Sequence, residues 1–214
     1  MKKRIRNFRI NYQNGSLSKQ SVSADPIKQF EKWFEEYMEV SLVEFNAMIL
    51  STVGKDGKVS SRVVLLKDFD KNGLVFFSNY ESRKGRQIAE NPHGAICFFW
   101  PELERQIRIE GSIDRLSDAE SDAYFATRPK KSQLGAWASA QSQILPNRFT
   151  LMRSFVMFSY KYFNKTVPRP KHWGGFRLKP DLFEFWQGRP SRLHDRIQFK
   201  LDDSGAWQID RLSP

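Results

Sequence analysis

The chain has 214 residues, 40% of them hydrophobic and 14% aromatic, which suits one generous domain with a real core and excludes global disorder. Its single cysteine excludes an internal disulfide framework and any multi-cysteine metal site. The net charge of +11 normally raises nucleic acid or an anionic membrane as a partner, but the basic residues are scattered through structured stretches. No apolar run approaches the roughly 18 residues of a membrane-spanning helix.

The first 24 residues contain basic residues and no acidic ones. They lack the apolar core of a secretory signal, so we expect a flexible basic arm over residues 1–24. The remainder, residues 25–214, is expected to form a single domain.

Asp25 and Pro26 are typical of a helix start, and apolar residues at helical spacing predict an amphipathic helix to about Met38. From Ala47 the period becomes that of strands, with a short helix predicted over residues 82–90. The strands predicted in this half span residues 47–53, 58–67, 74–78, 94–100 and 105–116. A run of short sequential strands predicts a mostly antiparallel barrel.

A capping box at Ser117 and Glu120 predicts a helix through Thr127, which Pro129 ends. Strand alternation returns towards the C-terminus, after two more helical patterns. The helices are predicted over residues 132–140 and 148–163, and the strands over residues 173–178, 182–186, 196–201 and 207–211. The fold class is therefore mainly β with flanking helices (α+β).

A stretch near the C-terminus breaks at Gly188 and Pro190 and then presents Arg192, His194 and Arg196 within five positions. On an extended backbone, residues two apart share a face, so these three side chains are expected to point the same way. The pattern favours an anion site with a titratable group. The alternative is an exposed edge strand with solvated charges.

Two earlier segments place cations where an anion would be favoured. The strand that runs from Arg62 to Lys67 carries a cation near each end, on opposite faces, and can hold two different anions. Arg83 and Lys84 begin a helix, where free backbone N–H groups favour an anion and oppose a cation unless an anion is bound. The alternatives are a strand with snorkelling basic ends and a solvated basic helix.

A third group lies around the predicted helix end. Tyr124 and Arg128 are four apart and share a helix face, and Ser132 follows just past Pro129. A phenol, a guanidinium and a hydroxyl together make a reasonable phosphate cradle. The alternative is a capped helix with one surface arginine. No metal-ligand spacing is present, and no Ser-His-Asp arrangement is supported.

Glu184-Phe185-Trp186-Gln187, four further residues and then Arg192-Leu193-His194-Asp195-Arg196 resemble the C-terminal signature of the pyridoxamine 5'-phosphate oxidases. The resemblance runs from about Arg9 to Pro214. It implies the split β-barrel of FMN-binding proteins, assembled as a homodimer with two sites at the subunit interface. We expect a cytoplasmic enzyme with no nucleic-acid or membrane partner.

The implied reaction converts pyridoxamine 5'-phosphate or pyridoxine 5'-phosphate to pyridoxal 5'-phosphate, in vitamin B6 metabolism. Hydride would pass from the substrate's C4' carbon to flavin N5, and dioxygen would reoxidise the flavin to yield hydrogen peroxide. The flavin does the redox chemistry, and the protein supplies position and electrostatics.

The resemblance also implies residue roles. The positions that match flavin contacts are Arg62, Val63, Val64, Leu65, Leu66, Lys67, Phe77, Ser78, Arg83, Lys84, Gln106, Gln141, Ser142, Trp186 and Arg196. Gln141 is implied to come from the other subunit. The positions that match substrate contacts are Arg9, Tyr12, Lys67, Tyr124, Arg128, Ser132, Arg192 and His194. Arg192 and His194 are the implied catalytic pair, and the resemblance leaves open whether His194 also moves a proton.

Two other functions fit the same residues. A related split-barrel flavin oxidoreductase would keep the flavin contacts and act on another substrate. A basic, non-enzymatic nucleic-acid-binding protein would be colourless and would bind DNA with a steep salt dependence.

Overall fold

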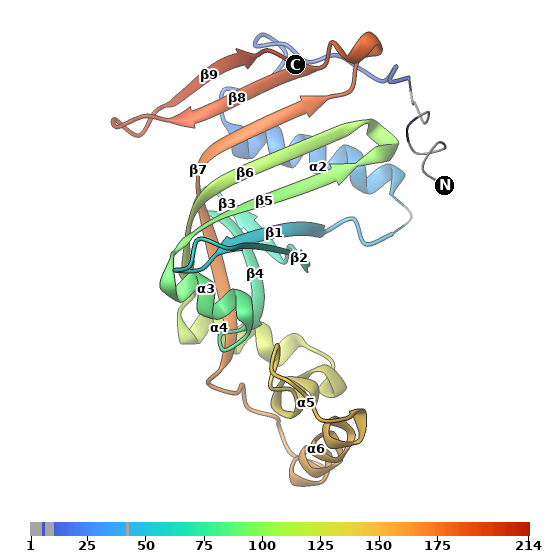
Figure 1. Cartoon of the computed structure of the whole chain (residues 1–214), viewed down its shortest axis with the longest axis vertical. Coiled ribbons are helices and arrows are strands. Elements are labelled where there is room, and N and C mark those ends of the chain that lie inside the picture. The colour runs from blue at the N-terminus through green and yellow to red at the C-terminus, as the bar shows by residue number, and fades with distance from the viewer. Residues whose placement is uncertain (1–5, 7–10, 42) are drawn as a thin grey trace. The chain divides into compact units, whose positions relative to one another are not determined.

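The computed structural model describes residue 6, residues 11–41 and residues 43–214. Within these residues, nine strands are hydrogen-bonded into one sheet (Figure 1). The helices are α2 (Pro26–Val40), α3 (Arg83–Glu90), α4 (Asp118–Thr127), α5 (Lys130–Ala138) and α6 (Arg148–Lys161), with short 3-10 turns at Pro101–Leu103 and Pro190–Arg192. The strands are β1 (Ala47–Val53), β2 (Val59–Leu65), β3 (Asp68–Asp70), β4 (Gly73–Asn79), β5 (His93–Trp100), β6 (Arg105–Arg115), β7 (Trp173–Gln187), β8 (Asp195–Leu201) and β9 (Trp207–Leu212).

The sheet has the strand order β2-β1-β5-β6-β7-β4-β3, and β8 pairs with both β7 and β9. The pairs of β3 with β4, β4 with β7, β7 with β8 and β8 with β9 are antiparallel. The first half of β7 pairs with β4 and its second half pairs with β8. The prediction of a mainly β fold with flanking helices is confirmed.

The chain divides into two compact units. Unit 1 comprises Met1–Met48, Ile96–Glu110 and Asp181–Pro214, and unit 2 comprises Ile49–Ala95 and Gly111–Pro180. Each unit has its own buried aromatic residues, and each carries part of the predicted functional residues.

In unit 1, helix α2 buries its aromatic face. The Asp25 carboxylate caps its first turn, as predicted, and the ring of Phe30 lies 5.2 Å from that of Phe98. Trp33 meets Phe185 edge to face at 5.3 Å. Such contacts add to the hydrophobic gain from burying large rings, so α2 is held mainly by packing.

The described part of the N-terminal segment is tied to unit 1. The backbone N–H groups of Gln13 and Asn14 both donate to the Glu104 carboxylate over 2.8 Å. The buried Leu17 donates its N–H to Asp195 over 3.0 Å. The domain boundary expected at residue 24 stays a prediction.

In unit 2, strand β4 supplies the core. Leu74 and Phe76 are fully buried, and Phe76 stacks on Phe176 of β7 at 5.3 Å. Gly73, where β4 begins, has a φ of +124°, and a Cβ there would lie 1.9 Å from the Leu178 carbonyl oxygen. Only glycine allows this close antiparallel start.

Three local predictions differ from the structure. Two strands were expected over residues 173–186, and the structure has one, because Pro180 lies where pairing passes from β4 to β8 and costs no bond to either strand. The three-residue strand β3 was missed. Helix α5 begins at Lys130, directly after Pro129, and not at Ser132. The capping box between Ser117 and Glu120 is confirmed.

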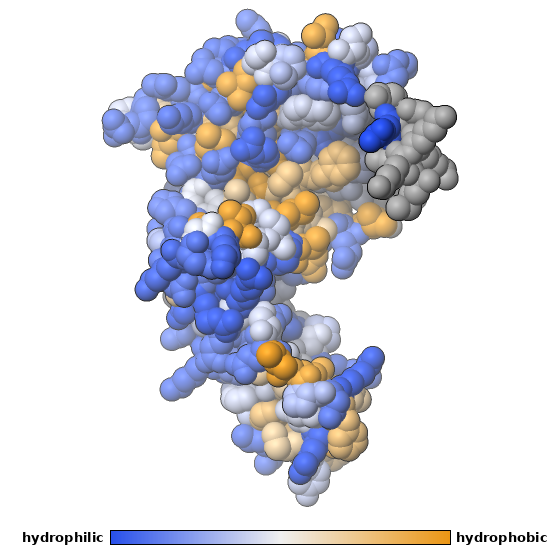
Figure 2. All heavy atoms as spheres, viewed as in Figure 1, coloured by the Kyte–Doolittle hydropathy of each residue, from blue (hydrophilic) through white to orange (hydrophobic). Residues whose placement is uncertain are grey.

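Helix α6 exposes much of its apolar surface. Phe149, Val156 and Tyr160 are 75%, 62% and 86% exposed, and the helix has no buried residue. Figure 2 shows hydrophobic and hydrophilic residues mixed over the part of the surface where α6 lies in Figure 1. In the described part of the chain, no helix has the length and apolar character needed to cross a membrane.

Candidate active site

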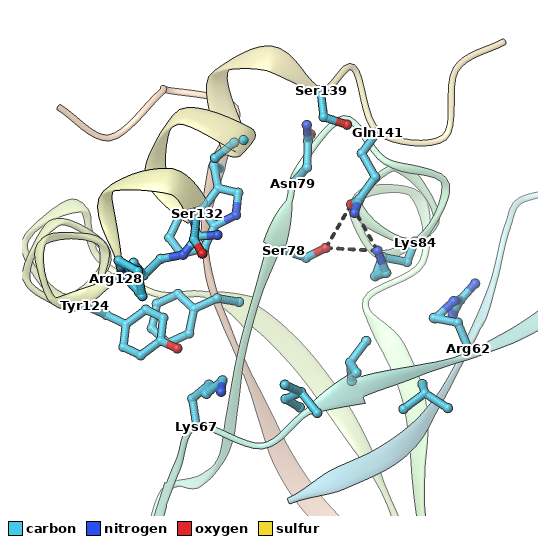
Figure 3. A pocket seen from close by; sticks show the side chains of 18 residues that line it. Arg62, Lys67, Ser78, Asn79, Lys84, Tyr124, Arg128, Ser132, Ser139 and Gln141 are labelled. Carbon is cyan, nitrogen blue, oxygen red and sulfur yellow. Dashed lines mark hydrogen bonds between the residues drawn. The ribbon is translucent and has the colours of Figure 1, made fainter. Parts of the chain in front are cut away.

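Unit 2 contains a pocket of about 810 Å³ at the ends of β2 and β4 and beside α5 (Figure 3). It is lined by Arg62, Val63, Val64, Leu65, Lys67, Phe77, Ser78, Asn79, Lys84, Tyr124, Arg128, Pro129, Ser132, Gly135, Ala136, Ser139, Gln141 and Trp173. Four of these described residues are basic and none is acidic. The pocket is therefore suited to an anion.

Lys84 lies at one end of the pocket and is only 9% exposed. Its Nζ donates to Ser78 Oγ over 2.9 Å and to Gln141 Oε1 over 3.3 Å. Burial, and then the nearby charge of Arg62, lower the pKa of Lys84 to about 8. Within the described residues only neutral oxygens contact this ammonium, so an anion entering the pocket would gain a charge-assisted contact.

Arg62 is held at the same end by neutral acceptors. Its Nη1 donates to the Leu50 carbonyl oxygen over 3.0 Å and to Thr52 Oγ1 over 2.7 Å. The buried Gln87 accepts from Thr52 and Ser60, each over 2.7 Å, and thereby orders the hydroxyls around Arg62. Sequence reasoning missed this supporting group, because a buried glutamine on a short helix has no signature of its own.

Lys67, Tyr124, Arg128 and Ser132 lie together at the other end of the pocket, as the resemblance implied (Figure 3). Phe77 stacks on Tyr124 with ring centroids 3.8 Å apart and on Trp173 at 5.5 Å. Burial raises the pKa of Tyr124, so its phenol stays protonated and can donate a hydrogen bond. Trp173 was not predicted as a pocket residue.

Arg128 follows the last residue of α4 in an extended conformation, so it does not share a helix face with Tyr124 as expected. Its guanidinium lies 4.4 Å from the centre of the Trp173 ring. Its Nη1 is buried and has no hydrogen-bond partner among the described residues. Burial lowers the pKa of Arg128. A buried guanidinium donor without an acceptor is suited to an anionic ligand.

Several predicted residues lie outside this pocket. Leu66 is buried just past the end of β2, while Arg83 and Ser142 are exposed in the single chain. Gln141 lies in the same chain's pocket, and its expected donation from the other subunit stays a prediction. Arg9 falls outside the described residues.

The remaining predicted residues, Gln106, Trp186, Arg192, His194, Arg196 and Tyr12, belong to unit 1. The rings of Trp186 and His194 lie 4.6 Å apart, and Tyr12 meets both edge-on at 5.6 Å. His194 Nδ1 accepts from the backbone N–H of Arg189 over 3.2 Å. Burial, and then the charge of Arg192, lower the pKa of His194, so the neutral ring with its proton on Nε2 is favoured.

The expectation that Arg192, His194 and Arg196 share one strand face is wrong. Arg192 ends the 3-10 turn that starts at Pro190, and its φ of +63° is left-handed. Strand β8 begins only at Asp195. The interruption of the strand at Pro190 therefore extends past Arg192, and of these three residues only Arg196 lies on a strand, where the alternation rule applies.

Arg196 is directly opposite Trp186 in the pairing of β7 with β8. Its Nε donates to the buried carboxylate of Glu184 over 2.8 Å, and its Nη1 donates to the Ser213 carbonyl oxygen over 2.8 Å. The hydrogen bond to Glu184 raises the pKa of Arg196. Glu184 was quoted in the sequence signature but given no role.

A mainly antiparallel sheet with a pocket lined by four cations is suited to phosphate-bearing small molecules. Comparison with known proteins narrows this class. A family model described as pyridoxamine 5'-phosphate oxidase matches residues 34–160, and one described as the pyridoxine 5'-phosphate oxidase C-terminal dimerisation region matches residues 173–214.

The chain is 54% identical over 210 residues to the pyridoxine/pyridoxamine 5'-phosphate oxidase of Cupriavidus necator, covering 98% of this chain and 99% of that protein. It is 52% identical over 214 residues to the protein of the same name from Nostoc punctiforme, over the full length of both. The crystal structure of PhzG from Burkholderia lata 383 with tetrahydrophenazine-1-carboxylic acid has a TM-score of 0.87 and 28% identity, covering 94% of this chain and 99% of that one.

The chain belongs to the pyridoxine/pyridoxamine 5'-phosphate oxidase family. The predictions of a split β-barrel and of an oxidase of vitamin B6 metabolism are confirmed. Membership favours this function over a flavin enzyme with another substrate and over a nucleic-acid-binding protein.

Proposed function

We propose that the pocket of unit 2 holds two phosphate-bearing molecules at once, FMN at the Lys84 end and pyridoxamine or pyridoxine 5'-phosphate at the Arg128 end. The observation that carries this proposal is the pair of cation groups in one pocket whose described lining has no carboxylate. The buried Lys84 ammonium and the unpaired Nη1 of Arg128 each fit a phosphate oxygen.

At the FMN end, Lys84, Ser78 and Gln141 already form a cluster that a phosphate can join. Arg62 lies near enough to Lys84 for its charge to lower the pKa of the Lys84 ammonium. The hydrogen-bond partners of Arg62 are neutral, so they do not compensate the charge of its guanidinium. Val63, Val64 and Leu65 line the pocket and offer an apolar surface to the flavin ring. Arg83, Ser142 and Leu66 keep their proposed FMN roles by resemblance only.

At the substrate end, Arg128, Lys67, Tyr124 and Ser132 would hold the phosphate of the vitamin, and the stacked wall of Phe77 and Trp173 would fix Arg128 and Tyr124 in place. A phosphate held this way places the rest of the substrate in a defined position. Bound FMN supplies the redox chemistry, with dioxygen as electron acceptor and hydrogen peroxide as product.

We propose that Arg192 and His194 place the substrate's C4' carbon against the flavin. The N–H of Arg189 occupies His194 Nδ1, so Nε2–H is the group that faces a ligand as a hydrogen-bond donor. Tyr12 packs on both His194 and Trp186 and would limit water around the reacting carbon. Arg9 keeps its proposed substrate role by resemblance.

We further propose that the working enzyme is a cytoplasmic homodimer with the FMN sites at its subunit interface. The match of residues 173–214 to a dimerisation region supports the dimer, and so does the exposed apolar surface of α6. Gln106, Trp186 and Arg196 would complete the FMN contacts in this assembly. The single cysteine needs no oxidising compartment.

The affinity of the flavin-free protein for FMN and for riboflavin tests this proposal. Two charge-assisted contacts to phosphate should make FMN bind about a hundredfold more tightly than riboflavin, and Lys84→Met should remove much of that difference. Lys131→Ala, an exposed lysine on α5 outside the pocket lining, is the matched control and should change neither affinity. Equal affinities for the two flavins would contradict a phosphate site in this pocket.

A further inference from the structure

The carboxylate of Glu184 is the most deeply buried partner of a charge network on the surface of β6, β7 and β8 in unit 1. Its side chain is 5% exposed. One oxygen, Oε1, accepts from Arg196 Nε over 2.8 Å, and the other, Oε2, accepts from Arg108 Nη1 over 3.1 Å. Both oxygens of the carboxylate are therefore engaged, each by a different arginine.

Glu184 and Trp186 lie two apart on β7 and so face the same side of the sheet. Arg196 lies opposite Trp186 in the register of β7 and β8. The proposed FMN contacts Trp186 and Arg196 thus stand side by side, and Glu184 is the acidic residue next to them. Its contact with Nε fixes the plane of the Arg196 guanidinium, since Nε lies in that plane.

Arg196 is constrained from a second direction. Its Nη1 donates to the Ser213 carbonyl oxygen over 2.8 Å. Among the described residues no hydrogen bond uses Nη2, so that amino group is the one available to a ligand. A guanidinium fixed through two of its three nitrogens loses less freedom on binding than a mobile one.

Arg108 connects the network to an exposed acid. Its Nη2 donates to Glu110 Oε1 over 2.6 Å, and the Glu110 side chain is 40% exposed. Glu110 therefore shares Arg108 with Glu184 but, among the described residues, forms no ion pair with Arg196. Substitutions at Glu184 and at Glu110 remove the same charge from this surface, but only Glu184 contacts Arg196. Comparing the two therefore separates an effect on Arg196 from a general effect of charge.

We propose that Glu184 is a positioning residue for the flavin site, which orients Arg196 so that its Nη2 meets bound FMN. The inference rests on the proposed FMN role of Arg196. The network pairs two arginines with two glutamates, Arg108 and Arg196 with Glu110 and Glu184, and its charges balance. We therefore assign to Glu184 the orientation of the Arg196 guanidinium and not a contribution of net charge. Replacing the carboxylate by an amide leaves one arginine facing an N–H₂ group, and the preorganised orientation is lost.

A double-mutant cycle on FMN affinity tests the proposal. The flavin-free wild type, Glu184→Gln, Arg196→Ala and the double variant are titrated with FMN, and loss of flavin fluorescence gives each Kd. Glu184→Gln should weaken binding about tenfold, and Glu110→Gln by less than about twofold. In the Arg196→Ala background Glu184→Gln should have no further effect, because its action passes through Arg196.

A merely structural role predicts a different pattern. Glu184→Gln would then weaken FMN binding by the same factor with or without Arg196, and that result would overturn the proposal, as would equal losses for Glu184→Gln and Glu110→Gln. If Glu184→Gln does not fold, Arg196→Lys keeps the charge but not the planar fork; it should weaken FMN about tenfold, and unchanged affinity would overturn the proposal. Wild-type protein that takes up no FMN would overturn both this inference and the proposed function, whereas normal uptake with an unaffected variant would overturn the inference alone.

Discussion

The ammonium of Lys84 lies 2.9 Å from the hydroxyl oxygen of Ser78 at one end of the pocket. Ser78 in turn lies 3.3 Å from the amide oxygen of Gln141, which also accepts from Lys84. These neutral partners satisfy the donors of the ammonium but do not balance its charge. Burial, and then the charge of Arg62, lower the pKa of Lys84 to about 8, so the charge of Lys84 is sensitive to what binds beside it.

FMN binding should take up protons near pH 8. In the free protein Lys84 is then about half protonated, and a phosphate beside it favours the charged form. The affinity for FMN should accordingly fall as the pH rises above about 8. Calorimetric titrations in buffers of different ionisation enthalpy measure the proton uptake. Lys84→Met is the control, and the same uptake in that variant would rule out Lys84 as its source.

The free energy of unfolding of the flavin-free protein should change with pH in the opposite direction to the affinity for FMN. The pKa of Lys84 in the folded protein is about 8 and lies below the value of about 10.4 expected in the unfolded chain. Between these values the unfolded chain binds more protons, so this group makes the free energy of unfolding rise with pH. Urea unfolding at about pH 8 and about pH 10 should show a larger rise for the wild type than for Lys84→Met. A larger rise in the variant would contradict the buried ammonium.

Arg128→Ala should mainly raise KM for pyridoxine 5'-phosphate. The lost charge-assisted contact is worth about 1.5–3 kcal/mol, or a KM increase of about 10–150-fold, with kcat changed much less. Steady-state kinetics measures both quantities, and the exposed Lys131→Ala serves as control. An unchanged KM would show that the buried guanidinium does not bind the substrate phosphate.

His194 should titrate below the ordinary histidine range. Burial is the first cause of the lowered pKa and the charge of Arg192 the second, so Arg192→Ala should raise the pKa of His194 without restoring it fully. The chain has three histidines, which makes an NMR titration of their ring protons practical. A His194 pKa that Arg192→Ala leaves unmoved, or lowers, would refute the electrostatic link between the two residues.

Arg192 should mainly affect turnover, and Arg83 should mainly affect FMN binding. Arg192→Ala is expected to depress turnover far more than it weakens FMN binding, because Arg192 lies beside His194 in the sequence signature. Arg83→Ala should do the reverse, since its charge acts on Arg62 at the proposed FMN end. FMN titration and turnover of both variants give the comparison, and equal effects on both quantities would remove the division of roles.

Much of the fold could be predicted because its signals are local. The caps of α2 and α4 depend on Asp25, Ser117 and Glu120, which act within one turn of the chain. The pocket residues Arg62, Lys84 and Arg128 could be named because they belong to a recognisable pattern of spaced residues. Their grouping in one pocket then followed from the family resemblance and not from their spacing alone.

What could not be predicted depends on partners that are distant in the sequence. The continuity of β7 through Pro180 requires the exchange of β4 for β8 as the neighbouring strand. Gln87 orders Arg62, and Trp173 supports Arg128, through contacts that exist only in the folded protein. Arg192 likewise has a left-handed backbone, so the alternation of side chains along a strand does not apply to it. The sequence alone does not show where β8 begins, and so does not show that Arg192 lies in a turn before it.

The most direct test of the two-phosphate pocket is the visible spectrum of the FMN-loaded enzyme under anaerobic conditions, before and after addition of pyridoxamine 5'-phosphate or of pyridoxamine. With a second phosphate site in the pocket, the phosphorylated compound should bleach the flavin bands at a concentration about a hundredfold or more below that needed for pyridoxamine. Flavin bands that persist with pyridoxamine 5'-phosphate, or that bleach equally with both compounds, would contradict the two-phosphate pocket.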